Sequence, residues 1–292
     1  MIADFFISCV LHLLRPFIHT SRGKYRHRNG YEYALRQTGA KLVEIGSETG
    51  TTISDLELAI KPSTAAFFWF QGAMSSNRDL PLPEVINVAN RHNIPVVVDA
   101  AAQLPPASNL WYFTRMGAAL AIFSGGKDLQ GPQSSGLVLG RTDLVEACRL
   151  QGNPNPFIGR PMKVGKEELM GLLAAVERYL KLDHEARKQF CEAAVRTWCE
   201  MLNSLPGVNA ERDFPNEAGQ PLPRCHVRID PKMVRISRDA IVNQLLTGVP
   251  AVAVEPYCDH DIRMNPMTLH PGEERIVLSR LVETISGSAG HH

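Results

Sequence analysis

Two short apolar runs, each ending on polar residues, most constrain how this chain can fold. Residues 94–98 run directly into Asp99, and residues 119–123 run into the sequence Ser-Gly-Gly-Lys, which ends on Lys127. Runs that are apolar throughout are typical of parallel strands covered on both faces. Helical spacing over residues 83–92, just before the first run, indicates a helix-then-strand order with right-handed crossovers. The sequence therefore predicts an α/β fold with an open, mainly parallel sheet.

Asp99 and Lys127 follow two consecutive strands of this predicted sheet. Ligands of open α/β sheets bind beyond the carboxyl ends of the strands, so we expect both side chains to face one pocket. Pyridoxal phosphate chemistry uses such a pair. A lysine holds the cofactor as a Schiff base, and a carboxylate keeps the pyridine nitrogen protonated so that the ring accepts electrons. Gly125 and Gly126 would let the backbone approach the cofactor and leave amide groups free for its phosphate.

The segment around Lys127 also fits other interpretations. A lysine after two glycines is compatible with a surface turn. A P-loop would need GxxxxGK followed by Ser or Thr, but Ala121 and Asp128 stand at the positions that decide this, which disfavours a nucleotide site. The spacing from Ser124 to Lys127 fits a serine acyl-transfer enzyme. That mechanism places both residues on a helix, where each intervening glycine costs about 1 kcal/mol.

Three segments resemble a known family: VVVDAAAQLPP at 96–106, FSGGKDLQGPQSSGLVLGR at 123–141 and GRPMKVGKEELMGLL at 159–173. They are similar to the selenocysteine-synthase-like branch of the fold-type I pyridoxal phosphate enzymes. That branch includes L-seryl-tRNA selenium transferase and D-glucosaminate-6-phosphate ammonia-lyase. The resemblance covers residues 23–285 and is most specific around Lys127. It implies an aspartate aminotransferase-like large domain and a small α+β C-terminal domain.

The resemblance also implies roles for individual residues. Lys127 matches the Schiff-base lysine, Asp99 the partner of the pyridinium nitrogen, and Ser124 a residue that binds the cofactor phosphate. Gln103, four residues after Asp99, is a candidate contact of the cofactor ring or its 3-oxygen, and a loop hydrogen bond explains it equally well. Relatives usually carry Gly-Leu-Arg after the lysine, where this chain has an acidic residue, Asp128.

Four further polar residues are candidates for substrate binding. By resemblance, Gln133 and Ser134 line the site or reach the cofactor phosphate of the partner subunit. Arg160 and Lys163 suit a substrate carboxylate or phosphate, because a guanidinium binds such groups through two hydrogen bonds. A solvated loop explains the two basic residues almost as well. The resemblance implies a small-molecule substrate, an amino acid or an amino sugar acid.

The chain is expected to divide into several parts. These are 1–22 as an N-terminal remnant or helix, 23–165 as the large cofactor-binding domain, 166–201 as one bridging helix, 202–285 as the small domain, and 286–292 as a tag-like tail. In the small domain, the patterns predict strands at 226–229 and 251–254 and helices at 237–246 and 273–285. Relatives have a glycine-rich phosphate-binding turn upstream of the region that matches Gly23. Residues 1–22 do not resemble it, so we expect an N-terminally truncated relative.

The composition bears on whether the protein binds nucleic acid and on the cellular compartment in which it works. Lys and Arg number 31 against 30 Asp and Glu, so no overall basic field favours a nucleic acid. The six cysteines form no CxxC pair, which is typical of a reducing compartment. The apolar stretch in residues 1–20 is too short and too interrupted to span a membrane, and it lacks the basic start of a signal peptide. We expect a cytoplasmic protein, and we expect no metal at the segment 258–261.

These observations predict a pyridoxal-phosphate-dependent lyase or transferase. The resemblance implies Schiff base formation, loss of the Cα proton and β-elimination, in a homodimer or higher homo-oligomer. One alternative is a truncated, non-catalytic relative that serves as an oligomerising or regulatory scaffold. A second is L-seryl-tRNA selenium transferase itself, and a third is a serine acyl-transfer enzyme.

Overall fold

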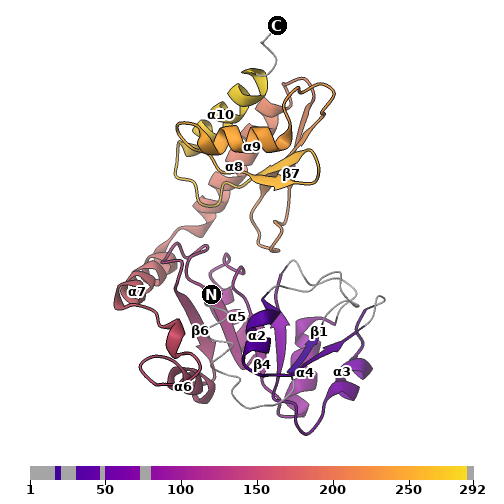
Figure 1. Ribbon diagram of the computed structural model, residues 1–292, viewed down its shortest axis with the longest axis vertical. Coiled ribbons are helices and arrows are strands. Elements are labelled where there is room, and N and C mark those ends of the chain that lie inside the picture. The colour runs from indigo at the N-terminus through magenta and orange to yellow at the C-terminus, as the bar shows by residue number, and fades with distance from the viewer. Residues whose placement is uncertain (1–16, 21–30, 47–49, 73–79, 288–292) are drawn as a thin grey trace. The chain divides into compact units, whose positions relative to one another are not determined.

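The computed structural model of the chain describes residues 17–20, 31–46, 50–72 and 80–287. It divides into two compact units, whose boundary lies between Leu182 and Asp183, and residues 217–219 group with the first unit. Figure 1 shows the strands and helices of each unit along the colour gradient of the chain. No helix in these described ranges is both long and apolar enough to cross a membrane.

The first unit is built on a six-stranded sheet in the order β2-β1-β3-β4-β5-β6. Its strands are β1 (Phe17–Thr20), β2 (Leu42–Ile45), β3 (Ala66–Phe70), β4 (Val96–Asp99), β5 (Leu120–Ser124) and β6 (Gly136–Gly140). The first five strands are parallel, which was predicted for β2 to β5 but not for β1. Strand β6 runs antiparallel to β5, because residues 125–135 join them without the crossover helix that a parallel connection needs.

Residues 17–20 differ from the expectation for the start of the chain. Residues 1–22 were predicted to be a remnant or a helix, but Phe17–Thr20 forms β1, which pairs with both β2 and β3. The remainder of that segment lies outside the described residues. Of the tail predicted at 286–292, residues 288–292 also lie outside them, whereas residues 286–287 belong to the last helix, Glu273–Gly287.

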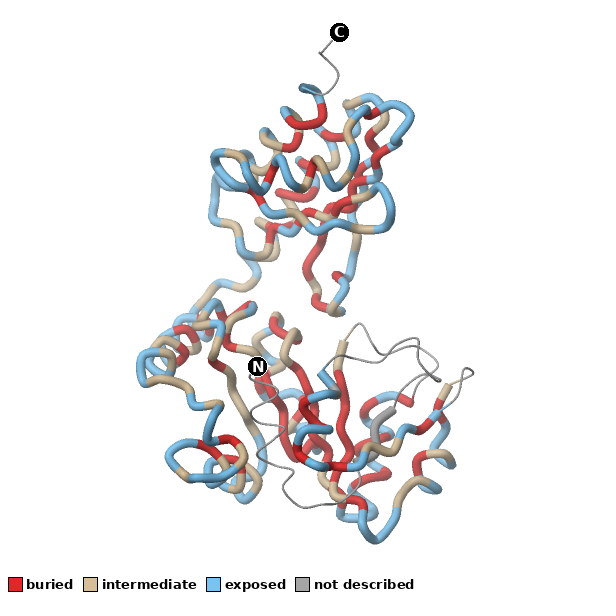
Figure 2. Tube along the Cα trace, viewed as in Figure 1, coloured by how far each residue is buried: buried red, intermediate tan, exposed pale blue. Residues whose placement is uncertain are grey.

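Helices cover both faces of this sheet. They are α2 (Glu32–Gln37), α3 (Ile53–Ala59), α4 (Leu82–Arg91), α5 (Asn109–Met116), α6 (Thr142–Gln151), the 3-10 helix η1 (Arg160–Met162) and α7 (Lys166–Lys181). Along β3, Phe67 packs into one core cluster with residues of α4 and α5, whereas Phe68 packs into another with residues of α2 and α6. Figure 2 shows buried residues concentrated along the central strands. The double cover explains why these strands are apolar at every position.

The single helix predicted over residues 166–201 is two helices in the structure. Helix α7 ends at Lys181, and α8 (His184–Leu202) begins after Asp183. Leu182 is extended, with ψ 144°, and the Asp183 carboxylate accepts the N–H of Ala186 at 2.9 Å. An aspartate in this position satisfies an otherwise unpaired amide of the new helix, so the prediction missed an N-cap within a continuous apolar pattern.

The second unit is an α+β structure, as predicted. Its antiparallel sheet has the order β7-β8-β10-β9, and its elements besides α8 are β7 (Val208–Asp213), β8 (Arg224–Ile229), α9 (Arg238–Thr247), β9 (Glu255–Tyr257), β10 (Asp261–Met264) and α10 (Glu273–Gly287). One sheet face packs against helices through a core that includes Trp198, Val227 and Leu281. The strand predicted at residues 251–254 is wrong, because these residues are irregular and the strand begins at Glu255.

Candidate active site

The carboxyl ends of β4 and β5 bring the predicted site residues to one edge of the sheet. The two strands are adjacent and parallel, and Asp99, the last residue of β4, pairs with Ile122 of β5. Strand β5 continues to Ser124, and the turn that follows contains Lys127. On the other side of β4, the N–H of Gln71 donates to the Asp99 carbonyl at 3.0 Å. Parallel strand pairing therefore places Asp99 and the Lys127 turn at the same edge.

The Asp99 side chain is held by its own loop. It is 7% exposed, and its Oδ1 accepts the N–H of Ala101 at 3.0 Å. A carboxylate that accepts a backbone amide keeps a defined orientation at the end of its strand. The buried carboxylate therefore has a fixed position at the sheet edge.

Lys127 and Ser124 provide an amine and a hydroxyl at the end of β5, the strand next to the one that carries Asp99. Lys127 is exposed and Ser124 is half-buried. Neither side chain makes a hydrogen bond or ion pair with the residues that the structure describes. Both polar groups are therefore available to a ligand.

The glycines before Lys127 are needed by the loop itself. The Gly125 N–H donates to the Ser135 carbonyl at 2.8 Å, so the expectation that this amide is free for a phosphate is wrong. A Cβ at Gly125 would collide with Ser135 Oγ and lie 2.9 Å from Leu172 Cδ1 of α7. A Cβ at Gly126 would lie 2.7 Å from Gln133 Cα. Close packing of the loop on itself and on α7 excludes any side chain at these two positions.

The predicted substrate residues Gln133 and Ser134 belong to the same loop. Gln133 is exposed, and its Nε2 donates to the Gly126 carbonyl at 2.9 Å. Next to them, the buried Ser135 donates its hydroxyl to the Pro132 carbonyl at 2.7 Å. These bonds fold residues 125–135 into one ordered loop, so Gln133 is fixed beside the glycines that precede Lys127.

Asp128 and Tyr179 anchor the loop to α7, and sequence reasoning missed this pair. Asp128 is 2% exposed, and its Oδ2 accepts the hydroxyl of the fully buried Tyr179 at 2.6 Å. Arg178 of the same helix donates to the Leu129 carbonyl at 3.2 Å. The available signal was a tyrosine within the apolar stripe of α7. The acidic residue after Lys127 therefore points into the protein and holds the loop in place.

Gln103, Arg160 and Lys163 have surroundings of their own. The Gln103 Nε2 donates to the Ala218 carbonyl at 2.9 Å, within the first unit. Gln103 thus makes the loop hydrogen bond that was the alternative to a contact with the cofactor. Arg160 and Lys163 are exposed on and just after η1, a segment separate from the Lys127 loop. Within the described ranges, no three His, Cys, Asp or Glu side chains are grouped as a metal site would require.

Several curated proteins are similar to this chain in sequence. A 5'-C-glycyluridine monooxygenase-decarboxylase from Streptomyces sp is 32% identical over 256 residues, covering 86% of this chain and 62% of its own length. A D-glucosaminate-6-phosphate ammonia lyase from Salmonella typhimurium is 29% identical over 259 residues, covering 88% of this chain and 67% of its own length. The chain thus spans less than two thirds of the first relative and about two thirds of the second.

Solved structures share the fold. The structure of a D-glucosaminate-6-phosphate ammonia-lyase matches with a TM-score of 0.78 and 26% identity, covering 98% of this chain and 80% of that one. A ureidoglycine-glyoxylate aminotransferase from Bacillus subtilis matches with a TM-score of 0.63 and 14% identity, covering 99% and 79%. The fold is therefore that of the fold-type I pyridoxal phosphate enzymes, as predicted.

A family model ties these similarities to the site. The model of L-seryl-tRNA selenium transferase matches residues 32–197, a segment that contains Asp99, the Lys127 loop and α7. Because the match covers more than half of the 292 residues, this chain belongs to the L-seryl-tRNA selenium transferase family.

Proposed function

We propose that this chain is a pyridoxal-phosphate-dependent lyase or transferase that acts on an amino acid or an amino sugar acid. One observation carries the proposal: the adjacent parallel strands β4 and β5 deliver Asp99 and the Lys127 turn to the same edge of the sheet. The family and the fold support it, because both are associated with this cofactor.

The polar groups at this edge fit the cofactor. The buried carboxylate of Asp99 suits the cationic ring nitrogen, the available amine of Lys127 suits covalent attachment at the aldehyde carbon, and the Ser124 hydroxyl suits the phosphate. Because the Gly125 N–H is already bonded to the Ser135 carbonyl, the role of Gly125 would be to let the backbone approach the cofactor closely. The rigid loop at 125–135, anchored on α7, would present Lys127 from a fixed base.

The proposed roles follow from these groups. Pyridoxal phosphate, when bound, supplies an electron sink for negative charge at the substrate Cα. Asp99 keeps the ring nitrogen protonated, which increases that capacity. The Nζ atom of Lys127 would hold the cofactor and would take the proton from the substrate Cα as a general base. Elimination of a group at the β-carbon would complete the reaction.

The substrate class rests on the relatives' names and on nearby charge. Those names mention glucosaminate 6-phosphate, a glycyl nucleoside and seryl-tRNA, each of which carries an amino acid group. Exposed Arg160 and Lys163 suit a carboxylate or phosphate on such a molecule, and Gln133 and Ser134 would line its path. The near-neutral charge of the chain favours a small molecule over a tRNA.

We also propose that the protein is a homodimer or a higher homo-oligomer. Helix α7 buries one face and exposes large apolar residues on another. These exposed residues are Leu169, Met170, Leu173 and Leu180. An apolar helix face of this kind suits contact with a second copy of the chain.

Borohydride reduction of the protein in the presence of pyridoxal phosphate tests the proposal. We expect a visible absorption band that reduction abolishes, and one labelled lysine. Because trypsin does not cleave at a modified lysine, the label on Lys127 should appear on the peptide 116–141. Lys127→Arg should abolish this labelling and lower turnover of an amino acid substrate by about 10²–10⁴-fold. The matched variant Lys61→Arg, at an exposed lysine, should leave both unchanged.

Asp99→Asn separates ring activation from attachment. This variant should still be labelled at Lys127, whereas turnover should fall at least about tenfold, since one pKa unit of lost interaction corresponds to about 1.4 kcal/mol. Labelling scattered over surface lysines, or none at all, would contradict the proposal and favour the scaffold alternative. Turnover of seryl-tRNA but of no free amino acid would favour the selenium transferase alternative.

A further inference from the structure

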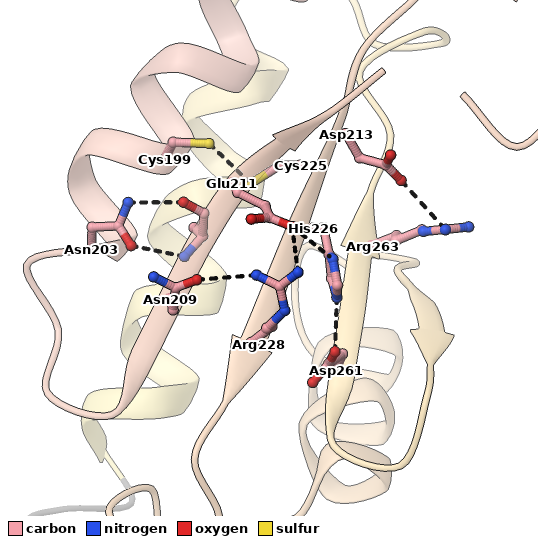
Figure 3. A network of polar contacts seen from close by, with 11 residues as sticks. Cys199, Asn203, Asn209, Glu211, Asp213, Cys225, His226, Arg228, Asp261 and Arg263 are labelled. Atoms are coloured by element: carbon pink, nitrogen blue, oxygen red, sulfur yellow. Dashed lines mark hydrogen bonds and ion pairs between the residues drawn. The ribbon is translucent and has the colours of Figure 1, made fainter. Parts of the chain in front are cut away.

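The second unit holds two cysteines in direct contact. Cys199 lies on α8 and Cys225 on β8, and their sulfur atoms are 3.7 Å apart (Figure 3). Helix and strand pack face to face here, so two elements 26 residues apart in sequence present their thiols to each other. The described cysteines also include buried Cys148 and Cys191 and exposed Cys258.

The two thiols differ in their access to solvent. Cys225 is 0% exposed, in a strand with β7 on one side and β10 on the other. Cys199 is partly exposed at the margin of the same core. A small oxidant from solvent therefore meets the partly exposed Cys199 before the buried Cys225.

We propose that Cys199 and Cys225 form a redox modification site, in which hydrogen peroxide oxidises Cys199 and Cys225 then closes a disulfide. The Cys199 sulfur attacks one peroxide oxygen, the O–O bond breaks, and the product is a sulfenic acid and water. The Cys225 sulfur then attacks the Cys199 sulfur, the S–O bond breaks, and the leaving hydroxide takes the Cys225 proton as a second water. Two thiols are oxidised while one hydrogen peroxide is reduced to two waters.

The pKa values of the two thiols shift in opposite directions, which supports this order of events. A hydrogen bond from the Cys225 thiol lowers the pKa of Cys199. The same bond, together with burial, raises the pKa of Cys225. The reactive species in thiol oxidation is the thiolate, so the partly exposed sulfur is also the more reactive one. Cys225 keeps its proton until the attack on the sulfenic acid releases it.

Geometry makes the second step short. The sulfurs have to approach from 3.7 Å to about 2.05 Å, and the helix and strand that carry them already share one core. Trp198, adjacent to Cys199, is buried, and its indole N–H donates to the Glu274 carbonyl at 2.8 Å. This bond fixes α8 in the core of the second unit directly beside Cys199.

Peptide mapping of the intact protein after treatment with hydrogen peroxide tests the proposal. Trypsin separates Cys199, in peptide 197–212, from Cys225, in peptide 225–228, and leaves Cys191 in a third peptide. We expect the first two peptides to be joined by a bond that dithiothreitol cleaves, and two of the six thiols to be lost. Oxidation of Cys258 while Cys199 and Cys225 stay reduced would overturn the proposal.

Single variants distinguish the attacking and resolving cysteines. In Cys225→Ser, a hydroxyl donor beside Cys199 is kept but the sulfenic acid on Cys199 cannot be resolved, so dimedone labelling of Cys199 should rise from a trace to near one equivalent. In Cys199→Ser, Cys225 should stay reduced, because solvent does not reach it. The control Cys258→Ser should form the bond as the unmodified protein does. A Cys199 that dimedone never labels in Cys225→Ser would contradict the assigned order.

Discussion

Single residues around Lys127 meet structural demands as well as the proposed chemical ones. The Gly125 N–H donates to the Ser135 carbonyl. Gly125 has no space for a side chain, because an added Cβ would lie less than 3 Å from atoms of Ser135 and Leu172. Asp99 is oriented by the amide of Ala101. The residues that we propose to hold a cofactor therefore depend on neighbours that never touch it.

Gly125→Ala tests the structural demand on this glycine. The added methyl group would force apart the Ser135 backbone, at 2.8 Å, and Leu172, so we expect a loss of about 1–3 kcal/mol in the free energy of unfolding. Urea denaturation measures the loss. The control is Gly287→Ala, where an added Cβ meets nothing within 4 Å. Equal stability of the two variants would show that the loop tolerates a side chain at 125.

Among the elements, α7 has a supporting role that its sequence alone does not reveal. Its buried face contributes Leu172 to the packing around Gly125, and Tyr179 to the bond with Asp128. Arg178 adds a bond to the Leu129 carbonyl. Helix and loop are thus joined at several points, and the position of Lys127 depends on α7.

Tyr179→Phe isolates the buried bond between helix and loop. Removal of the hydroxyl takes one donor from the buried Asp128 carboxylate, which we expect to cost about 1–3 kcal/mol of unfolding free energy. The same change at the exposed Tyr112 is the matched control and should cost nothing measurable. Chemical denaturation compares the two variants. A Tyr179→Phe protein as stable as the Tyr112→Phe protein would mean that this bond does not anchor the loop.

At the scale of the whole molecule, each unit has hydrophobic cores of its own. The clusters around β3 and β4 contain residues of the first unit only, and the cluster that includes Trp198 and Val227 contains residues of the second. The boundary at Leu182 and Asp183 coincides with the change of core. Separate cores predict that damage to one unit stays within it.

Two buried leucines test this separation. Leu245→Ala in α9 and Leu120→Ala in β5 each remove a side chain that is fully buried, at an expected cost of about 2–5 kcal/mol. Hydrogen exchange followed by mass spectrometry should show faster exchange in the second unit for Leu245→Ala, and in the first unit for Leu120→Ala. Faster exchange throughout the chain in either variant would mean that the two units unfold together.

Local patterns in the sequence determined the parallel strands and the candidate site. Continuous apolar runs before Asp99 and Ser124 indicate buried parallel strands, and their order along the chain predicts that both ends meet at one edge. The structure confirms this arrangement through the pairing of β4 with β5. These features follow from short stretches of chain, because burial on both faces leaves a signature at every residue of a strand.

Tertiary structure alone decided the features that join distant residues. The contact of Asp128 with Tyr179 spans 51 residues, and that of Cys199 with Cys225 spans 26. The place of β1 between β2 and β3 depends likewise on strand pairing. A sequence pattern records whether a residue is buried, but not which partner it meets there. That choice depends on how the packed elements fit together, and so it is made only in the folded chain.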